Sequence, residues 1–405
     1  MRRRLGSGPR DGRCDDRSVL AEDLRPTPTP SPLAPYDAVM LASFGGPDGP
    51  ADVLPFLRNV TAGKGIPDER LAEVAEHYHH FGGASPINGQ NIALREALEG
   101  ELRRRGIDVP VVWGNRNWTP YTVDALRAAH ADGARRVVAL VTSAYASYSG
   151  CRQYREDFWS SLEDLGTELG LAPGEQPLVL DKVRPYFNDP GFVQGNVDAV
   201  VEAWQDLPAD ARLVFVTHSV PTTMEAASGA CGPSYSEQHL DVAATVAASA
   251  AVRLGHTVEW ELTYCSRSGP PSQPWLEPDV NDHLARLHEE GVGSVVIAPI
   301  GFVSDHMEVV YDLDTEAMET AAELGMTAVR AATVGTREVF VRGLVDLLVE
   351  RAAEARALDA GEVPAEPVTT GWLPARPSAC RPGCCRRQDG VDSGRPAACS
   401  EDPHA

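Results

Sequence analysis

The chain has 405 residues, of which 43% are hydrophobic, and a formal net charge of −22 at pH 7. That length suits about two domains with real cores, and the acidity argues against nucleic acid and anionic membranes, which both attract basic patches. No apolar run reaches membrane-spanning length and no signal-peptide core follows Met1, so we expect a cytoplasmic protein whose eight cysteines are free thiols or metal ligands.

Residues 1–35 combine arginines, acids and prolines without hydrophobic periodicity, which is the composition of a disordered leader. From Tyr36 onward, short apolar runs alternate with segments of helical period. Strands are predicted in two sets of four, at residues 38–42, 109–113, 136–142, 178–183, 213–217, 258–263, 294–299 and 327–331. Helices are predicted around them, at residues 51–59, 68–80, 86–105, 120–131, 152–165, 191–205, 236–254, 279–290, 306–324 and 337–355.

This alternation predicts parallel, doubly wound sheets with right-handed crossovers. We therefore expect an α/β fold of two Rossmann-like lobes, each a four-stranded parallel sheet flanked by helices, with the active site in the cleft between the lobes. We place the first lobe at residues 36–190 and the second at 191–335. A C-terminal helix at 336–356 is expected to pack back on the first lobe, and a cysteine-containing tail follows at 357–405.

The second lobe carries two candidate catalytic residues near the carboxyl ends of strands. His218 directly follows the predicted strand 213–217, and Glu308 lies on the helix that follows the strand 294–299. Because parallel strands end at the same edge of a sheet, we expect His218 and Glu308 to converge in the cleft. The alternatives are a satisfied core histidine and an acidic helix face that is merely solvated. Three further acids share the helix face of Glu308 at steps of three and four, namely Asp305, Asp312 and Glu316.

Two positions of the first lobe are candidate ligand contacts. Ser85 stands between a glycine pair and a long predicted helix. Its hydroxyl either caps that helix or receives a ligand carboxylate together with the helix N-terminus. Tyr154 lies about one turn into the next helix after Cys151. At that place its ring faces either the cleft or the core.

The tail holds a compact set of thiols, Cys380, Cys384 and Cys385. Three neighbouring thiolates suit a metal ion or an iron–sulfur cluster, which generally takes four protein ligands. The alternative is a flexible tail whose cysteines are incidental. Four other cysteines are candidates for the fourth ligand, namely Cys151, Cys231, Cys265 and Cys399.

Four stretches taken together resemble the ferrochelatases, which insert ferrous iron into a porphyrin: LASFGGP, HFGGASPINGQN, THSVP and GFVSDHMEVVYDLD. They occur in the family's order across about residues 36–350. The resemblance implies two Rossmann-type lobes with the porphyrin bound between them. It also implies that His218 is the catalytic histidine and Glu308 the essential carboxylate, both acting at the iron. By the same resemblance the residues that contact the porphyrin or its propionates are Ser85, Tyr154 and Tyr78.

The composition and the cysteine-rich tail resemble actinobacterial members of that family, which are similar to coproporphyrin ferrochelatases. Several of these bind a 2Fe–2S cluster through one mid-chain and three C-terminal cysteines. Two positions depart from some Gram-positive enzymes: Phe44 stands where they have a tyrosine that can ligate iron, and His77 where they have an arginine. The resemblance implies a cluster whose ligands are Cys151, Cys380, Cys384 and Cys385, with Cys399 as a substitute for one of the last three.

We therefore expect a monomeric enzyme that takes Fe²⁺ as substrate and inserts it into coproporphyrin III, giving Fe-coproporphyrin III in haem b biosynthesis. In this hypothesis His218 removes pyrrole protons, and Glu308 binds iron and relays protons. The first alternative is the same chemistry on protoporphyrin IX. A second is a non-catalytic porphyrin or haem carrier, which would not need both residues. A third is a cobalt chelatase that acts on a sirohydrochlorin-like ring.

Overall fold

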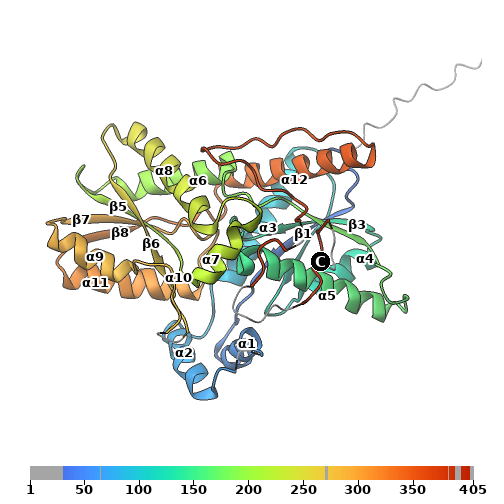
Figure 1. Ribbon diagram of the computed structural model, residues 1–405, viewed down its shortest axis with the longest axis horizontal. Coiled ribbons are helices and arrows are strands. Elements are labelled where there is room, and N and C mark those ends of the chain that lie inside the picture. The colour runs from blue at the N-terminus through green and yellow to red at the C-terminus, as the bar shows by residue number, and fades with distance from the viewer. Residues whose placement is uncertain (1–30, 64, 270–271, 382, 388–393, 402–405) are drawn as a thin grey trace, which may run out of the picture. The chain divides into compact units, whose positions relative to one another are not determined.

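The computed structural model describes residues 31–63, 65–269, 272–381, 383–387 and 394–401 (Figure 1). The chain divides into two compact units, Met1–Ser31 and Pro32–Ala405, and every element named below belongs to the second unit. The predicted leader therefore lies almost wholly outside the described residues. Leu33, within its last few residues, already has a fully buried side chain in the main hydrophobic core.

Two four-stranded parallel sheets form the framework (Figure 1). The first has the order β2-β1-β3-β4 and consists of β1 (Ala38–Ser43), β2 (Val111–Asn115), β3 (Arg136–Val141) and β4 (Val179–Lys182). The second has the order β6-β5-β7-β8 and consists of β5 (Arg212–His218), β6 (Trp260–Cys265), β7 (Ser294–Ala298) and β8 (Thr327–Arg330). The two sheets repeat one strand order, and each predicted strand is present to within a few residues. The predicted fold class is confirmed.

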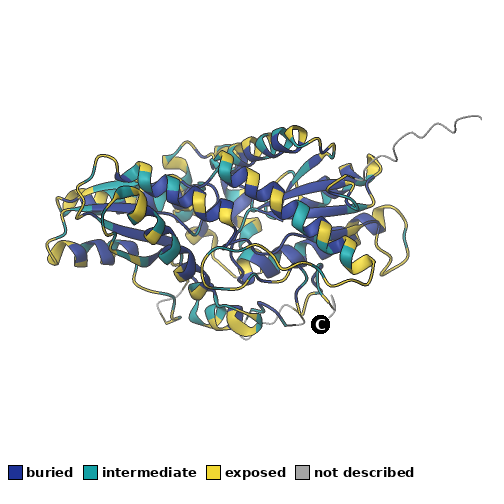
Figure 2. Ribbon diagram, turned by 90° about the horizontal axis from the view of Figure 1, so that it is seen from above, coloured by how far each residue is buried: buried dark blue, intermediate teal, exposed yellow. Residues whose placement is uncertain are grey.

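Burial explains why the strands were readable in the sequence. Every residue of β1 is buried, and so are all the inner residues of β5. Helices cover both faces of such a strand, so its sequence is apolar throughout instead of alternating. Figure 2 shows the consequence, with mostly dark blue strands inside and yellow on the outer faces of the helices and on the loops.

The helices follow the prediction with two exceptions. The helix expected at 306–324 is three consecutive segments, α10 (Met307–Tyr311), a π-helical segment (Asp312–Ala317) and α11 (Met318–Glu323). The short helix α7 (Thr222–Ser228) was not predicted. The others are α1 (Val53–Val60), α2 (Asp68–His80), α3 (Ile87–Arg104), α4 (Thr122–Ala131), α5 (Gln153–Glu168), α6 (Pro190–Trp204), α8 (Tyr235–Leu254), α9 (Val280–Glu289) and α12 (Glu338–Asp359).

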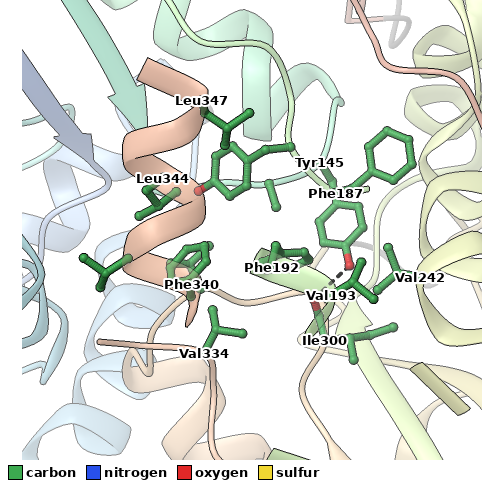
Figure 3. Close-up of a cluster of buried hydrophobic side chains, with 14 of the residues drawn as sticks. Tyr145, Phe187, Phe192, Val193, Val242, Ile300, Val334, Phe340, Leu344 and Leu347 are labelled. Carbon is green, nitrogen blue, oxygen red and sulfur yellow. Dashed lines mark hydrogen bonds between the residues drawn. The ribbon is translucent and has the colours of Figure 1, made fainter. Parts of the chain in front are cut away.

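The C-terminal helix α12 packs against both α6 and α3. Its Phe340 meets Phe192 of α6 with the ring centroids 5.9 Å apart, inside the largest buried cluster (Figure 3). In the same cluster the hydroxyl of Tyr145 donates a hydrogen bond to the carbonyl oxygen of Ile300 over 3.0 Å. Tyr145 follows β3 and Ile300 follows β7, so this buried contact joins the carboxyl ends of the two sheets.

The described tail after α12 is hydrogen-bonded to the folded chain at several points. The backbone N–H of Trp372 donates to the Asp241 carboxylate of α8 over 2.8 Å. Further on, the N–H of Ala398 donates to the carbonyl oxygen of Arg155 in α5 over 2.9 Å. These hydrogen bonds attach the backbone of the tail to α8 of the second lobe and to α5 of the first. A search of the described helices finds no candidate for a membrane span.

Candidate active site and thiol cluster

The end of β5 and the turn after β7 bring His218 and Glu308 together, as predicted from their places in the chain. His218 is the last residue of β5, and Glu308 lies in the first turn of α10. The Nε2 atom of His218 is 3.5 Å from an oxygen of Glu308, and the two side chains are 33% and 52% exposed. Gly301 lets the turn after β7 come close to β5, because a Cβ at this position would lie only 2.1 Å from the hydroxyl of Thr217.

Hydrogen bonding determines which ring nitrogen of His218 faces the carboxylate. The Nδ1 atom contacts the carbonyl oxygen of Ser219. Because a carbonyl oxygen can only accept, Nδ1 carries the proton. In the neutral ring the lone pair is then on Nε2, the atom that faces Glu308. Two electron-pair donors facing each other in this way attract a proton or a metal cation into the space between them.

His306 is a third member of this group, and the sequence analysis gave it no role. It directly precedes α10, and its Nδ1 atom is 3.8 Å from the same oxygen of Glu308. Its ring packs edge-on against Phe302 with the centroids 5.1 Å apart. Burial lowers the pKa of His306, which favours the neutral ring at neutral pH. In the sequence, the sign of this placement was the position of His306 in SDHMEVV. A histidine with a purely structural role in the turn would look the same there.

The four acids of this helical region differ in burial and in partners. The π-helical segment bonds to the fifth residue instead of the fourth, which rotates the side chains that follow. Asp305 forms an ion pair with Arg330 at 3.2 Å. Burial raises the pKa of Asp312 to about 7, and the nearby charge of Glu308 adds to the shift. Glu316 is exposed.

Helix α2 brings side chains of the first lobe to the same place. Burial first, and then the negative charge of Glu308, raise the pKa of Tyr78 above its usual value. The neighbouring His77 stacks on Tyr311 of α10, with centroids 3.9 Å apart and planes 7° from parallel. Tyr78 therefore belongs to the surroundings of Glu308.

Ser85 and Tyr154 lie deeper in the first lobe. Ser85 is buried against the loop after β1, where a Cβ on Gly46 would lie 2.7 Å from the serine Cβ. Tyr154 is buried in the lobe's own core, and burial raises its pKa to about 12. The guanidinium of Arg116, a residue that the sequence analysis missed, lies 4.9 Å from the Tyr154 ring and 5.0 Å from Phe44. In the described chain no hydrogen bond or ion pair joins Ser85 or Tyr154 to the histidine–carboxylate pair.

A second group of reactive side chains lies where the tail returns to the start of α5. Four buried cysteines pack into one cluster there: Cys151, Cys380, Cys384 and Cys385. We call them the thiol quartet. The thiols of its last two members are 3.8 Å apart. Among the described residues no group of three or more His, Cys, Asp or Glu side chains is arranged to hold a single metal ion.

The remaining described cysteines are placed differently. The thiol of Cys399 donates to the carbonyl oxygen of Leu180 over 3.3 Å and packs against the first lobe's core. Cys265 is buried at the end of β6, in the core of the second sheet. Cys231 is half-buried and borders the quartet. The structure thus brings together the four cysteines that the resemblance implies as cluster ligands.

The two parallel sheets flanked by helices define an α/β protein. The histidine and the carboxylate that follow strands of its second sheet form a site that suits a metal cation. The chain matches the family model described as Ferrochelatase over residues 36–352. It belongs to the ferrochelatase family, which confirms the resemblance seen in its motifs.

Several curated relatives are similar over nearly their whole length. The protein named coproporphyrin III ferrochelatase of Streptomyces coelicolor is 51% identical over 382 residues, which are 92% of this chain and 98% of the relative. The proteins of the same name from Leifsonia xyli and Streptomyces griseus are 50% and 53% identical over 86% and 87% of this chain, and over 91% and 94% of their own lengths. Among solved structures, SirB from Bacillus subtilis with Fe³⁺ covers 79% of this chain and 97% of its own, with a TM-score of 0.47 and 11% identity.

Proposed function

We propose that the protein inserts ferrous iron into coproporphyrin III, giving Fe-coproporphyrin III for haem b biosynthesis. Membership of the ferrochelatase family and the names of its half-identical relatives support the reaction and the substrate. The observation that carries the proposal is the pair formed by His218 and Glu308, 3.5 Å apart at the strand ends. Two ligands at right angles on one ion, each bonded over ~2.1 Å, are about 3 Å apart, so a small shift would let both bind one cation.

Insertion exchanges two pyrrole N–H protons for one Fe²⁺, and the pair supplies what that exchange needs. With Nδ1 committed to the carbonyl of Ser219, the free lone pair on Nε2 of His218 accepts a pyrrole proton. General-base help of this kind is typically worth ~10²–10⁴-fold in rate. Ferrous iron accepts both carboxylate and imidazole ligands, so Glu308 receives the incoming cation. Its 52% exposure leaves it open to solvent, from which iron arrives.

Protons leave through the buried acid behind this pair. Asp312 accepts a hydrogen bond from the hydroxyl of Ser266, and its pKa is raised to about 7, chiefly by burial. A carboxyl group with that pKa both takes up and releases a proton at neutral pH. Asp312 therefore passes protons from the site toward the exposed Glu316.

Residues of the first lobe hold the porphyrin in this proposal. The raised pKa of Tyr78 keeps its hydroxyl protonated, so the hydroxyl donates a hydrogen bond to the porphyrin beside Glu308. In this proposal Ser85 and Tyr154 contact the porphyrin or its propionates, and the cation of Arg116 beside the Tyr154 ring suits a substrate with several propionates.

A turnover comparison tests the proposal. The full chain is assayed anaerobically with Fe²⁺ and either coproporphyrin III or protoporphyrin IX, and we expect a clear preference for coproporphyrin III. His218→Ala should abolish insertion while it leaves porphyrin binding, measured by fluorescence, largely intact. His288→Ala, an exposed histidine of α9, is the matched control. Normal turnover by His218→Ala would remove the catalytic assignment, and a preference for protoporphyrin IX would change the substrate.

We further propose that the thiol quartet holds a 2Fe–2S cluster, through Cys151, Cys380, Cys384 and Cys385. In such a cluster four thiolates divide between two irons, so they need not close around one centre. Four buried thiols from two distant parts of the chain fit this requirement. When bound, the cluster supplies one-electron chemistry and a strong link between the tail and the start of α5.

Metal analysis tests the cluster. Anaerobically purified protein should contain iron and acid-labile sulfide, and should show visible absorption bands apart from any porphyrin band. Zinc in place of iron would remove the cluster from the account.

We also propose that the protein acts as a monomer in the cytoplasm, where the seven described cysteines stay as free thiols or ligands. Light scattering of the purified chain and fractionation of cells check these two points.

A further inference from the structure

Three buried cations surround the thiol quartet. Lys182 ends β4, Arg155 lies in α5 and Arg376 lies in the tail, and they are 3%, 0% and 3% exposed. Burying a cation without a counter-charge costs several kcal/mol. The partner of each cation therefore shows what the surrounding site is built to hold.

The contacts of Lys182 and Arg376 lead directly to the thiols. Arg376 donates to the sulfurs of Cys384 and Cys385, at 3.6 and 3.8 Å. Lys182 and Cys151 line the same small cavity of about 20 Å³, which is room for about one water. The only hydrogen bond of the Lys182 ammonium within the described chain goes to the carbonyl oxygen of Val183, at 3.3 Å.

Arg155 completes the set from the other side. It donates to the carbonyl oxygen of Ala398 over 3.0 Å and to the hydroxyl of Ser400. Its Nη1 atom is buried without a hydrogen-bond partner among the described residues. Burial lowers the pKa of Arg155, but the thiols, led by Cys380 and then Cys151, raise it by more.

A comparison with other buried cations of this chain shows that the arrangement is unusual. Arg152 forms an ion pair with Glu156 at 3.0 Å, and Arg184 forms one with Glu350 at 2.8 Å. By contrast, within the described residues none of Lys182, Arg155 and Arg376 forms an ion pair with a carboxylate. Among the described residues, the groups left to supply their counter-charge are the cysteines.

The choice of residue at position 182 supports this conclusion. The whole chain contains two lysines, Lys64 and Lys182, among 36 basic residues. An ammonium group is a compact point charge with three donors, whereas a guanidinium is a broad planar fork. The ammonium thus places a full positive charge beside a cavity with room for about one water. Burial lowers the pKa of Lys182, but the thiols, led by Cys151, more than reverse that shift.

We propose that Lys182, Arg155 and Arg376 form a cationic shell that stabilises the negative charge of the iron–sulfur centre on the thiol quartet and so sets its reduction potential. The proposal rests on the proposed 2Fe–2S cluster. Four thiolates bring an oxidised cluster to a net charge of about −2, and reduction makes it about −3. Three cations balance the reduced form more completely than the oxidised one, so the shell favours reduction. Net charge and hydrogen bonds to sulfur are the means by which proteins tune such centres.

The test compares two substitutions at one position in the full, cluster-containing protein. Lys182→Met keeps the length of the side chain and removes the charge, whereas Lys182→Arg keeps the charge. A dye-mediated titration followed by electron paramagnetic resonance measures the midpoint of each. We expect Lys182→Met to disfavour reduction about tenfold, which is about 59 mV for one electron. Lys182→Arg should stay close to the wild type.

Stability of the metal-free protein supplies a second readout. Without the cluster, Lys182→Met removes a buried charge that has no partner, so its thermal midpoint should equal or exceed that of the wild type. With the cluster bound, the same variant should lose iron faster to a chelator. If Lys182→Met does not fold, Arg376→Gln replaces it, with the same expected direction of the potential.

The outcomes separate this proposal from the function it rests on. A wild-type protein without iron and sulfide would remove both the cluster and the cationic shell, while the iron-insertion assay would still decide the activity. If the wild type contains the cluster and Lys182→Met leaves its reduction midpoint unchanged, only the proposal of the cationic shell is overturned. A lowered midpoint in Lys182→Met with a normal one in Lys182→Arg establishes it.

Discussion

The strand-end site and the thiol quartet are opposite in burial and in charge. His218 and Glu308 are 33% and 52% exposed, and the acid Asp312 lies near Glu308. The quartet is closed, with Cys384 only 2% exposed, and it is bordered by buried cations that form no ion pair with a carboxylate of the described residues. An open anionic site suits a cation that arrives and leaves, whereas a closed cationic site suits an anionic group that stays. In the proposed function, the first site handles the substrate iron and the second holds a resident cluster.

The largest effect on iron insertion is expected when Glu308, the carboxylate of the open site, loses its negative charge. Glu308→Gln keeps the size of the side chain but removes its charge and weakens its binding of iron. We expect the rate of iron insertion to fall by ~10²-fold or more, with a raised KM for iron. Steady-state kinetics with Fe²⁺ or Zn²⁺ measure this. Glu319→Gln, an exposed acid in α11, is the control, and a wild-type kcat and KM in Glu308→Gln would count against its role.

The next prediction removes one member of the closed site. Cys384→Ser should lose the visible bands of the cluster and lower the thermal midpoint by on the order of 5 °C, because bound metal contributes directly to folding stability. Cys399→Ser is the matched control, since its thiol contacts the carbonyl of Leu180 and not the quartet. Loss of the bands in Cys399→Ser, with retention in Cys384→Ser, would exchange their roles.

Much of this comparison could be predicted from the sequence. The strands could be predicted because residues such as Val214, Phe215 and Val216 are fully buried on both faces. His218 and Glu308 followed from the rule that parallel strands end at one edge. The thiols were grouped by resemblance, since nothing local shows where a tail without periodicity will return.

The rest depends on tertiary structure. A π-helical segment has the same apolar pattern as an α-helix, so the sequence predicted one continuous helix at 306–324. Helix α7 is short and starts after Pro221, and its formation depends on packing. The burial of Lys182 was not foreseeable either, because a lysine at a strand end ordinarily reads as solvated.

A smaller effect is expected for the buried acid behind the open site. The pKa of Asp312 is raised from 3.8 to about 7, chiefly by burial. The folded protein therefore binds the extra proton between these values, and its stability falls as the pH rises from about 4 to about 7. Asp312→Asn should flatten that fall in stability. It should also lower insertion by about tenfold near neutral pH by removing the proton relay. Denaturant unfolding and kcat, each measured across this range, check the two statements, and an unchanged pH profile of both would exclude the relay.

The smallest effect is expected at Tyr78, where the two lobes meet. Tyr78→Phe keeps the ring, which packs against Phe56 with the centroids 6.1 Å apart, so the thermal midpoint should not change. It removes a hydroxyl that stays protonated because burial and the charge of Glu308 raise its pKa. Loss of one hydrogen bond to the substrate should raise the KM for porphyrin about 2- to 10-fold and leave the KM for iron unaltered. Tyr121→Phe, at an exposed tyrosine, is the control. A raised KM for iron instead would assign Tyr78 to the path of the cation, on the anionic side of the comparison.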